Sequence, residues 1–234
     1  MNQRILIDYF VASWKIQSYD EQQQLRFFHE LDRSPGDFQL IKSYYGLKCC
    51  YYYEGVKIHV GDDLVILDCS GKGCRTMEEK FGWDWGQKFN EWQLELMQHR
   101  HGEPPAMHVA RLDVACDLLD DDEITVPKLQ DYVRKGKFTC LSQYHICTDG
   151  NEEGIYFGSP RSDRRLRIYN KAKEQGIETP WVRFEFQLRN DNAISFLLNY
   201  FQEKHIGKTF YGMMHNYLNF TVPSVMEKMT VGDN

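Results

Sequence analysis

The chain has 234 residues, of which 42% are hydrophobic and 26% are charged, values typical of a globular protein with one substantial core. It contains no apolar stretch of membrane-spanning length, and its start, MNQRILIDYF, lacks the features of a signal peptide. We therefore expect a cytoplasmic protein that makes no membrane contact. The seven cysteines are scattered without a CxxC pair, which disfavours a zinc or redox centre and indicates reduced thiols.

The net charge of -6 is unusual for a nucleic-acid-binding protein, because Lys and Arg side chains normally supply much of the affinity for phosphate. Charge is nevertheless uneven along the chain. The stretch from Arg161 to Lys173, RSDRRLRIYNKAK, holds six basic residues and the single acid Asp163, whereas acids gather at 119–123. This asymmetry favours a basic cleft on an acidic body, and the alternative is a solvated charged face.

Hydrophobic periodicity and turn residues divide the first half of the chain into strands and two helices. Asp20 is a suitable N-cap for the first helix, and Phe89 and Trp92 belong to the apolar stripe of the second. Residues 70–75, SGKGCR, are expected to form a tight turn. In chain order the predicted elements are a strand at 5–14, a helix at 19–31, strands at 44–53, 56–60 and 64–69, and a helix at 86–99.

The second half shows no repeat of the first and no low-complexity linker. A helix is expected to start at Thr125, since Pro127 is tolerated in a first turn. The pattern predicts one α+β domain over 1–234, a mostly antiparallel sheet with helices packed on one face, and a helical C-terminal appendage at 192–220. The predicted elements are a strand at 107–117, a helix at 125–135, strands at 141–147, 154–158, 165–171 and 181–188, and helices at 192–204 and 210–219.

Three of these strands have an unusual polar face. Because alternate residues of a strand point to the same side, each polar face can be identified directly from the sequence. If the three faces lie on one side of the sheet, they bring a tyrosine, carboxylates and cations together. The residues concerned are Arg111, Asp113 and Asp117 on the first strand, Arg167, Tyr169 and Lys171 on the second, and Arg183, Glu185 and Gln187 on the third.

This combination is what transesterification of DNA requires. Tyr169 is the candidate nucleophile, because a phenol oxygen can hold a phosphate covalently and can leave again in the joining step. Lys171 or Arg167 could favour the phenolate, and a divalent metal ion on Asp113 and Glu185 would polarise the scissile phosphate. Carboxylate oxygens suit Mg²⁺ or Mn²⁺. The alternative is a packed tyrosine beside ordinary cross-strand ion pairs.

Five segments, in this order, cover most of the chain: IDYFVASW at 7–14, LDCSGKGCR at 67–75, RLDVACD at 111–117, YFGSPRSDRRLRIYNKAKE at 156–174 and VRFEFQL at 182–188. Their combination resembles the replication initiation factor family (Rep_trans). That family contains initiators of rolling-circle plasmids and of some filamentous phages, and it is related to relaxases of integrative conjugative elements. The combination is specific although no single segment is.

The resemblance implies a site-specific endonuclease that nicks and rejoins DNA. Tyr169 would form a 5′-phosphotyrosyl bond and release a 3′-hydroxyl that primes replication or transfer. It also implies a metal site, for which Asp113, Glu185 and Asp117 are the candidates. The expected DNA-binding residues are Arg161, Arg164, Arg165, Lys173, Lys72, Arg75, Arg111 and Arg183.

The expected partner is DNA, as a single strand or as cruciform origin DNA. The resemblance also allows for a homodimer and for a host helicase or polymerase as partners. The sequence shows no convincing helix-turn-helix or origin-recognition region of the kind that many relatives carry. The His-hydrophobic-His metal signature of other rolling-circle enzymes is also absent. His59, His108 and His145 stand alone in apolar strands and are expected to be core or edge residues.

Two other functions fit the same residues. The first is a DNA-binding accessory module without catalysis, in which aromatic residues stack on single-stranded bases and Arg161 to Lys173 follows the backbone. The second is a metal nuclease that uses water instead of tyrosine. The aromatic residues of the first alternative are Tyr44, Tyr45, Tyr51, Tyr52 and Tyr53.

Overall fold

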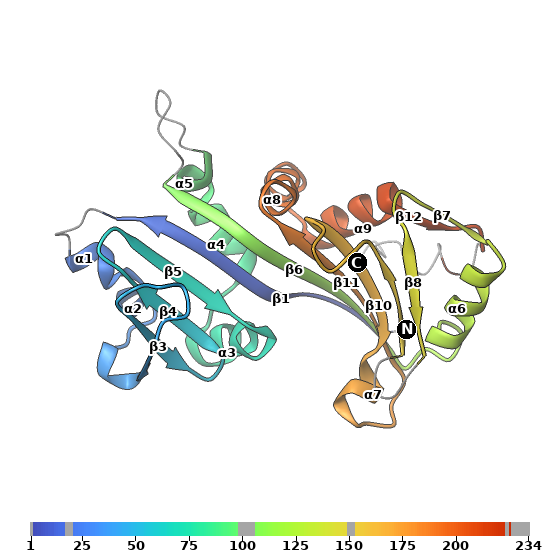
Figure 1. Cartoon of the computed structure of the whole chain (residues 1–234), viewed down its shortest axis with the longest axis horizontal. Helices are drawn as coiled ribbons and strands as arrows, with labels where there is room; N and C mark the ends of the chain where they lie inside the picture. The colour runs from blue at the N-terminus through green and yellow to red at the C-terminus, as the bar shows by residue number, and fades with distance from the viewer. Residues whose placement is uncertain (1, 17–20, 98–105, 149–152, 223–224, 226–234) are drawn as a thin grey trace. The chain divides into compact units, whose positions relative to one another are not determined.

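The protein is described from a computed structural model, in which residues 2–16, 21–97, 106–148, 153–222 and 225 are described. The chain forms two compact units (Figure 1). The N-terminal unit is Ile7–Leu112, and the C-terminal unit combines Met1–Leu6 with Asp113–Asn234. Of the helices in the described part of the chain, none has both the length and the apolar character that a membrane crossing requires.

The described strands are hydrogen-bonded in the order β2-β3-β4-β5-β1-β6-β11-β10-β9-β8, and β1 and β6 run through both units. Every strand pair whose register is resolved is antiparallel. This confirms the predicted α+β fold with a mostly antiparallel sheet and helices on one side. The prediction of a single catalytic domain over 1–234 stays a prediction.

The N-terminal unit builds its core between the sheet and short helices. The β1 strand places Phe10 and Trp14 on one face, and the rings of Trp85 and Trp92 lie within 5.2 and 5.8 Å of Phe10. The elements are β1 (Asn2–Lys15), α1 (Glu21–Gln24), α2 (Arg26–Glu30), the 3₁₀ helix η1 (Pro35–Asp37), β2 (Gln39–Ile41), β3 (Cys49–Tyr53), β4 (Val56–Val60), β5 (Leu64–Cys69), α3 (Gly71–Phe81), α4 (Trp85–Glu91) and α5 (Gln93–Met97).

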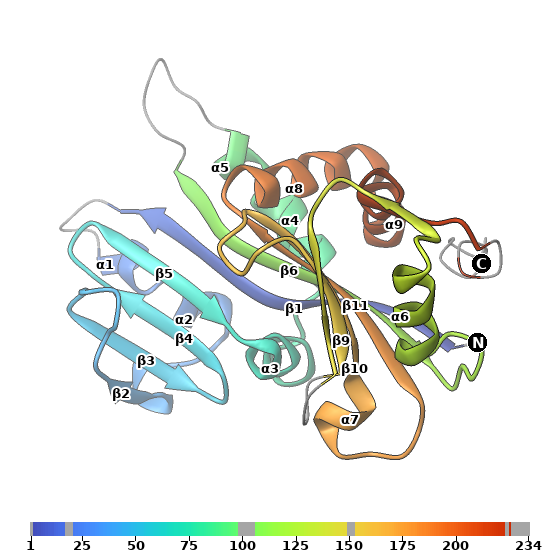
Figure 2. The same cartoon turned by 45° about the vertical axis from the view of Figure 1, so that its right-hand side comes forward.

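The C-terminal unit follows the same plan with longer helices. Phe184 and Phe186 of β11 are fully buried, and the ring of Phe186 lies 5.6 Å from those of Phe210 and Tyr217 on α9. Figure 2 shows α7 continuing from the end of β10. The elements are β6 (Met107–Leu119), α6 (Val126–Arg134), β7 (Phe138–Cys140), β8 (Tyr144–Cys147), β9 (Gly154–Phe157), β10 (Arg164–Asn170), α7 (Lys171–Gln175), β11 (Trp181–Arg189), α8 (Asp191–Glu203), α9 (Ile206–Tyr217) and β12 (Leu218–Phe220).

The two units repeat one arrangement of strands. In each, a long strand is followed by a helical segment, by four antiparallel strands and by a further helix, and the C-terminal unit adds β7 before these strands and α7 between β10 and β11. The sheet order is β2-β3-β4-β5-β1 in the first and β8-β9-β10-β11-β6 in the second. No sequence repeat was predicted, because what the two units share is mainly the order in which their strands pair. The equivalence pairs β3, β4 and β5 with β9, β10 and β11.

Several predicted boundaries were wrong, each for a local reason. Only 49–53 of the predicted strand 44–53 is extended, since 44–48 forms turns. The helix predicted at 86–99 is divided into α4 and α5 at Trp92, and 98–99 lie outside the described residues. The strand predicted at 141–147 begins only at Tyr144. Residues 19–20 of the first predicted helix are likewise not among those described.

The SGKGCR segment is the start of a helix and not a turn. The Ser70 side chain accepts a hydrogen bond from the Gly73 amide and caps α3, which begins at Gly71. A Cβ atom at Gly73 would lie 2.2 Å from the carbonyl oxygen of Gly55, so only glycine allows α3 to pack this closely on the β3–β4 turn. The glycines that suggested a turn are therefore present for close backbone packing.

Candidate active site

The β10–β11 pair carries the predicted nucleophile on its polar face. The pairing sets Arg167 opposite Glu185 and Tyr169 opposite Arg183. The alternate residues Ile168 and Phe184 are fully buried in the core. Strand alternation therefore turns the phenol, the carboxylate and the cations away from that core, as the sequence pattern predicted. Lys171 belongs to α7, because Asn170 caps that helix by accepting a hydrogen bond from the Lys173 amide.

A buried carboxylate is the centre of this face. The Tyr169 hydroxyl donates to Oε2 of Glu185 at 2.8 Å, and Nη1 of Arg167 donates to Oε1 at 3.1 Å. The side-chain amide Nε2 of Gln187 donates to the same Oε1 at 3.3 Å. Tyr169 is 5% exposed and Glu185 is 2% exposed, so these bonds lie in a weakly screened environment. The Glu185 side chain thus fixes the phenol in one orientation.

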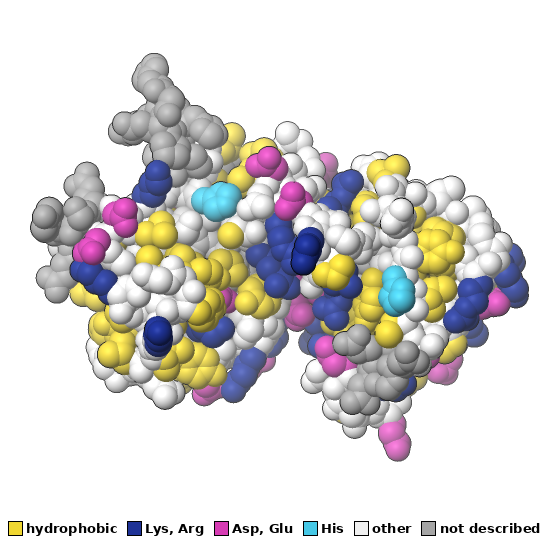
Figure 3. Space-filling view, viewed as in Figure 1, with side chains coloured by type: hydrophobic (Ala, Val, Ile, Leu, Met, Phe, Trp, Pro, Cys, Tyr) yellow, Lys and Arg dark blue, Asp and Glu magenta, His cyan; other side chains and the backbone are white. Residues whose placement is uncertain are grey.

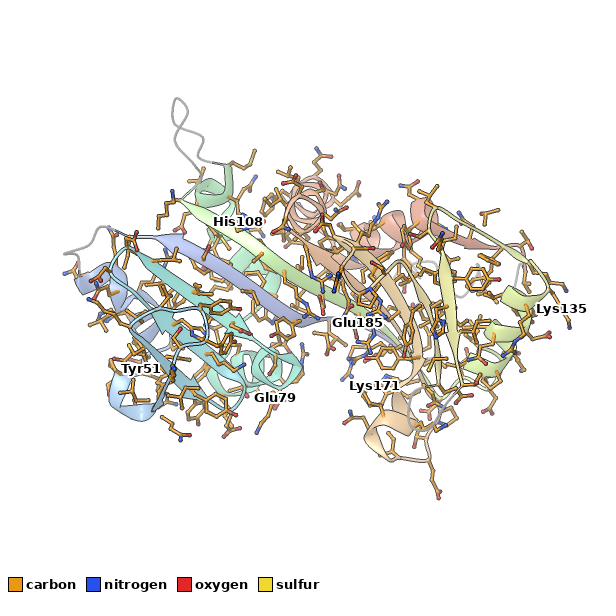
Figure 4. The ribbon with its side chains drawn as sticks, in the orientation of Figure 1. Tyr51, Glu79, His108, Lys135, Lys171 and Glu185 are labelled. Atoms are coloured by element: carbon orange, nitrogen blue, oxygen red, sulfur yellow. The ribbon has the colours of Figure 1, made fainter. Side chains whose placement is uncertain are left out.

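Cations surround the phenol ring. The guanidinium carbon of Arg167 lies 4.7 Å from the Tyr169 ring centroid, and Nζ of Lys171 lies 5.8 Å from it. Figure 4 shows Glu185 and Lys171, which β11 and the start of α7 contribute. Burial, followed by the negative charge of Glu185, raises the pKa of Tyr169 well above its ordinary value, and Arg183 opposes this shift. The phenol is therefore neutral at physiological pH and needs a proton acceptor in order to act.

A second ion pair lies on the adjoining strand. Arg183 donates two hydrogen bonds to Asp117, at 2.6 and 3.0 Å, and Arg4 donates a third at 2.9 Å. Burial would raise the pKa of Asp117, but the hydrogen bonds and charge of Arg183 outweigh it and hold that pKa below its ordinary value. The ligand role predicted for Asp117 stays a prediction, and it would require the loss of these bonds.

Asp113 lies on the same face of β6 as Asp117, and it is 2% exposed. β6 is hydrogen-bonded to β11, the strand that carries Glu185.

The predicted metal ligands are carboxylates on neighbouring strands. Among the residues described, no group of three or more His, Cys, Asp or Glu side chains is placed to hold an ion. Mg²⁺ commonly takes one or two protein carboxylates and completes its shell with water and substrate phosphate. The carboxylates of Asp113 and Glu185 are donors of the kind that suits Mg²⁺ or Mn²⁺, and their role as ligands stays a prediction.

The predicted DNA-binding residues divide between the two units. In the C-terminal unit, Arg161 and Lys173 are exposed, and Arg164 and Arg165 are half-buried. Lys and Arg side chains gather over β10 and β11 in the view of Figure 3. Arg183 is buried in its ion pair. The other predicted residues, Lys72, Arg75 and Arg111, belong to the N-terminal unit.

The N-terminal cations have protein contacts of their own. The Arg75 guanidinium donates to the Ile7 carbonyl and pairs with Glu78. The Arg111 guanidinium lies 4.2 Å from the Tyr9 ring centroid. The Lys72 side chain is 67% exposed, and its Nζ lies 4.0 Å from Oε2 of Glu54. Their predicted role in DNA binding stays a prediction.

Sequence reasoning missed two members of the site. Arg4 binds Asp117 from β1, and no local pattern could predict a contact between residues 113 positions apart. The Tyr156 ring lies 4.9 Å from the guanidinium carbon of Arg165 and 5.7 Å from that of Arg167. Its position on β9, opposite Arg167, is a signal that only strand pairing reveals.

Residues 107–230 match the replication initiation factor family, and the chain belongs to this family. The matched range contains β10, β11 and the Tyr169–Glu185 pair. This is the family that the five segments identified in the sequence resemble.

Two known proteins are similar over most of the chain. A protein of Bacillus subtilis (strain 168) named as a DNA relaxase, NicK, is 26% identical over 247 residues, which cover 92% of this chain. The chain spans 64% of that relative's length. The structure of a rolling circle replication initiator protein from Geobacillus stearothermophilus matches with a TM-score of 0.75 and 22% identity, over 94% of this chain and 87% of the other. This structural match shows the fold.

Proposed function

We propose that this protein nicks and rejoins DNA by tyrosine transesterification, and so initiates rolling-circle replication or conjugative transfer. Membership of the replication initiation factor family supports this proposal, as do the names of the B. subtilis and G. stearothermophilus relatives. The observation that carries it is the hydrogen bond from the Tyr169 hydroxyl to Glu185, with Arg167 on the other carboxylate oxygen.

The geometry suits attack by the phenol oxygen on a backbone phosphorus. In the proposed step, Tyr169 Oη forms a bond to phosphorus and the P–O3′ bond breaks. The phenol proton passes to Oε2 of Glu185, and the departing 3′ oxygen leaves as a hydroxyl after taking a proton from solvent. The product is a 5′-phosphotyrosyl linkage, which the reverse attack by a 3′-hydroxyl resolves into joined DNA.

The cations complete this chemistry. Arg167 and Lys171 lie on the ring of Tyr169, where positive charge stabilises a phenolate as it forms. Arg161, Arg164, Arg165 and Lys173 supply charge for the neighbouring phosphates. Asp113 and Glu185 would hold Mg²⁺ or Mn²⁺, which would polarise the scissile phosphate when bound.

The proposed partner is DNA, single-stranded or extruded as a cruciform at an origin. A homodimer, a host helicase or polymerase, and a cytoplasmic location complete the proposal. These points rest on the family alone.

A nicking assay tests the proposal and separates it from its two rivals. Supercoiled plasmid and a labelled single strand are incubated with Mg²⁺, with Mn²⁺ and with chelator, and the products are resolved on a denaturing gel. We expect cleavage with a covalent protein–DNA adduct in the wild type and neither in Tyr169→Phe. Tyr211→Phe, which removes another buried hydroxyl of the same unit, should keep both. Cleavage without an adduct would favour a water-using nuclease, and binding without cleavage would favour an accessory module.

A further inference from the structure

The N-terminal unit carries a polar row that matches the row of the candidate active site. In the C-terminal unit, Tyr156, Arg167 and Glu185 lie opposite one another on β9, β10 and β11. On the equivalent strands β3, β4 and β5, the paired residues are Tyr52, Lys57 and Asp68. Both rows therefore contain a tyrosine, a cation and a carboxylate on three successive strands. Asp68 is 1% exposed, as buried as its counterpart.

The position of the nucleophile differs between the two rows. Tyr169 follows Arg167 by two residues, and the residue that follows Lys57 by two is His59. His59 is fully buried, and its Nδ1 lies 2.9 Å from the Ser43 hydroxyl. Burial lowers the pKa of His59 to about 4, so the ring is neutral at physiological pH. The position equivalent to Tyr169 therefore carries no phenol, although Tyr52 belongs to the row and Tyr9 of β1 is also hydrogen-bonded to Asp68.

Two tyrosines from the β2–β3 connection supply hydroxyls to this row instead. Tyr44 and Tyr45 both donate to Oδ2 of Asp68, the latter at 3.2 Å. Their rings lie 4.6 Å apart between centroids, and each packs edge-on against His59, at 4.7 and 4.8 Å. Asp68 and His59 thus contact both tyrosine side chains, at the hydroxyls and at the rings respectively.

Both tyrosine residues are nevertheless exposed to solvent. Tyr44 is 56% exposed and Tyr45 is 42% exposed, although their hydroxyls are bound to a buried carboxylate. Nζ of Lys57 lies 3.5 Å from the Tyr44 hydroxyl and 5.4 Å from its ring centroid. The result is a pair of ordered, exposed aromatic rings with a cation at one edge. Because the rings are already ordered, a ligand that stacks on them loses little further side-chain freedom.

We propose that Tyr44, Tyr45 and Lys57 form a second DNA-contact site, at which an unpaired base stacks on the rings and its phosphate meets Lys57. Aromatic platforms beside cations are the usual means of holding single-stranded DNA without sequence preference. The proposal relies on the proposed function only in taking DNA as the ligand. The site binds a strand that the C-terminal unit cleaves, and it performs no chemistry of its own.

Binding of a fluorescent single-stranded oligonucleotide tests the site without cleavage. Anisotropy is measured in chelator on a Tyr169→Phe background, with Tyr44→Ala and Tyr45→Ala combined. We expect the Kd to rise roughly tenfold, as loss of a stacking platform implies. The Tyr44→Phe, Tyr45→Phe pair keeps both rings and should lie between the parent and the alanine pair. Tyr144→Ala removes an exposed ring of the other unit and should leave the Kd unchanged.

Photocrosslinking locates the contact independently of affinity. An oligonucleotide carrying 5-iododeoxyuridine is irradiated with the Tyr169→Phe protein, and the crosslinked peptide is identified by mass spectrometry. We expect a crosslink at Tyr44 or Tyr45. An unchanged Kd in a folded alanine pair, or crosslinks confined to the C-terminal unit, would overturn the proposal. If Tyr44 and Tyr45 bind a protein and not DNA, the Kd will likewise be unchanged, and the proposal is overturned.

The two proposals fail separately. In proteins that retain Tyr169, the alanine pair should form the covalent adduct at the parent rate when DNA is saturating. If adduct formation is absent in every variant while the alanine pair still weakens binding, the tyrosine mechanism fails and the second site stands. If adducts form and binding is unaffected by the alanine pair, the second site fails and the mechanism stands.

Discussion

The two units show how one strand arrangement can carry two kinds of polar row. In the C-terminal unit the tyrosine is part of β10, is buried and is hydrogen-bonded to Glu185. In the N-terminal unit Tyr44 and Tyr45 come from a connection, remain exposed and are hydrogen-bonded to Asp68, which Tyr9 of β1 also contacts. A phenol fixed within a sheet suits a reaction that needs exact placement, whereas exposed rings suit contact with a base. The exposed pair Tyr44 and Tyr45 distinguishes the N-terminal row.

The largest expected effect is at the nucleophile. Tyr169→Phe removes the oxygen that would bond to phosphorus and leaves the ring in place, so adduct formation should fall by at least about a thousandfold. Affinity for single-stranded DNA should change by no more than about twofold, because the cations remain. Single-turnover cleavage and anisotropy measure the two quantities. Residual adduct at the parent rate would assign the chemistry to another residue.

The ion pair on β6 and β11 has no counterpart in the N-terminal row, where Ile66 occupies the position equivalent to Arg183. Asp117→Ala leaves the buried Arg183 guanidinium without its carboxylate, and should lower the free energy of unfolding by about 3–5 kcal/mol. Asp131→Ala removes an exposed i,i+4 pair with Lys135 and should cost less than about 1 kcal/mol. Urea unfolding compares them. Equal losses in the two variants would show that the buried pair is not structural.

Glu185→Gln keeps the shape of the side chain but removes the charge and the proton acceptor. The rate of adduct formation at pH 7 should fall by roughly a hundredfold or more. The remaining rate should increase with pH, because hydroxide then replaces Glu185 as the base. Single-turnover rates from pH 6 to 10 measure this. Asp68→Asn is the matched change in the N-terminal row, and the rate of adduct formation at saturating DNA should not respond to it.

The smallest effect concerns stability at alkaline pH. The pKa of Tyr169 is raised in the folded state, so the folded protein holds the phenol proton at a pH at which the unfolded chain releases it. The contribution of Tyr169 to the free energy of unfolding is fully present below about pH 10, the ordinary tyrosine pKa. It decreases as the pH rises above that value. Tyr169→Phe should therefore lose stability less steeply than the wild type between pH 9.5 and 11. Parallel slopes would contradict the burial of the phenol.

Local patterns predicted the polar face that carries Tyr169 but few of the residues that contact it. Alternation in 181–188 separates Val182, Phe184 and Phe186 from Glu185, because a strand has only two sides. The same rule placed Arg167 and Tyr169 together. It could not reveal Arg4, whose partner is far along the chain. Nor could it place Tyr44 and Tyr45, since hydroxyl contacts to Asp68 hold that connection out of the predicted strand.

Glycine and lysine positions were misassigned because their local signals are ambiguous. Gly71 and Gly73 favour a turn by composition, but the Ser70 cap makes them the start of a helix, in which Gly73 packs against Gly55 and Gly71 against Asp8. Lys171 continues the alternation of β10 by spacing, but the Asn170 cap starts α7 at that residue. Tertiary contact decides both cases, and such contact is not present in a short stretch of sequence.

The most direct test of the mechanism is mass spectrometry of the covalent adduct. Wild-type protein is trapped on a single-stranded substrate, digested with nuclease and protease, and the phosphorylated or nucleotide-bearing peptide is sequenced. The modification should lie on Tyr169, on the peptide that joins β10 to α7. A modification on any other tyrosine, or cleavage with none, would contradict the assignment of Tyr169 and Glu185 as the reacting pair.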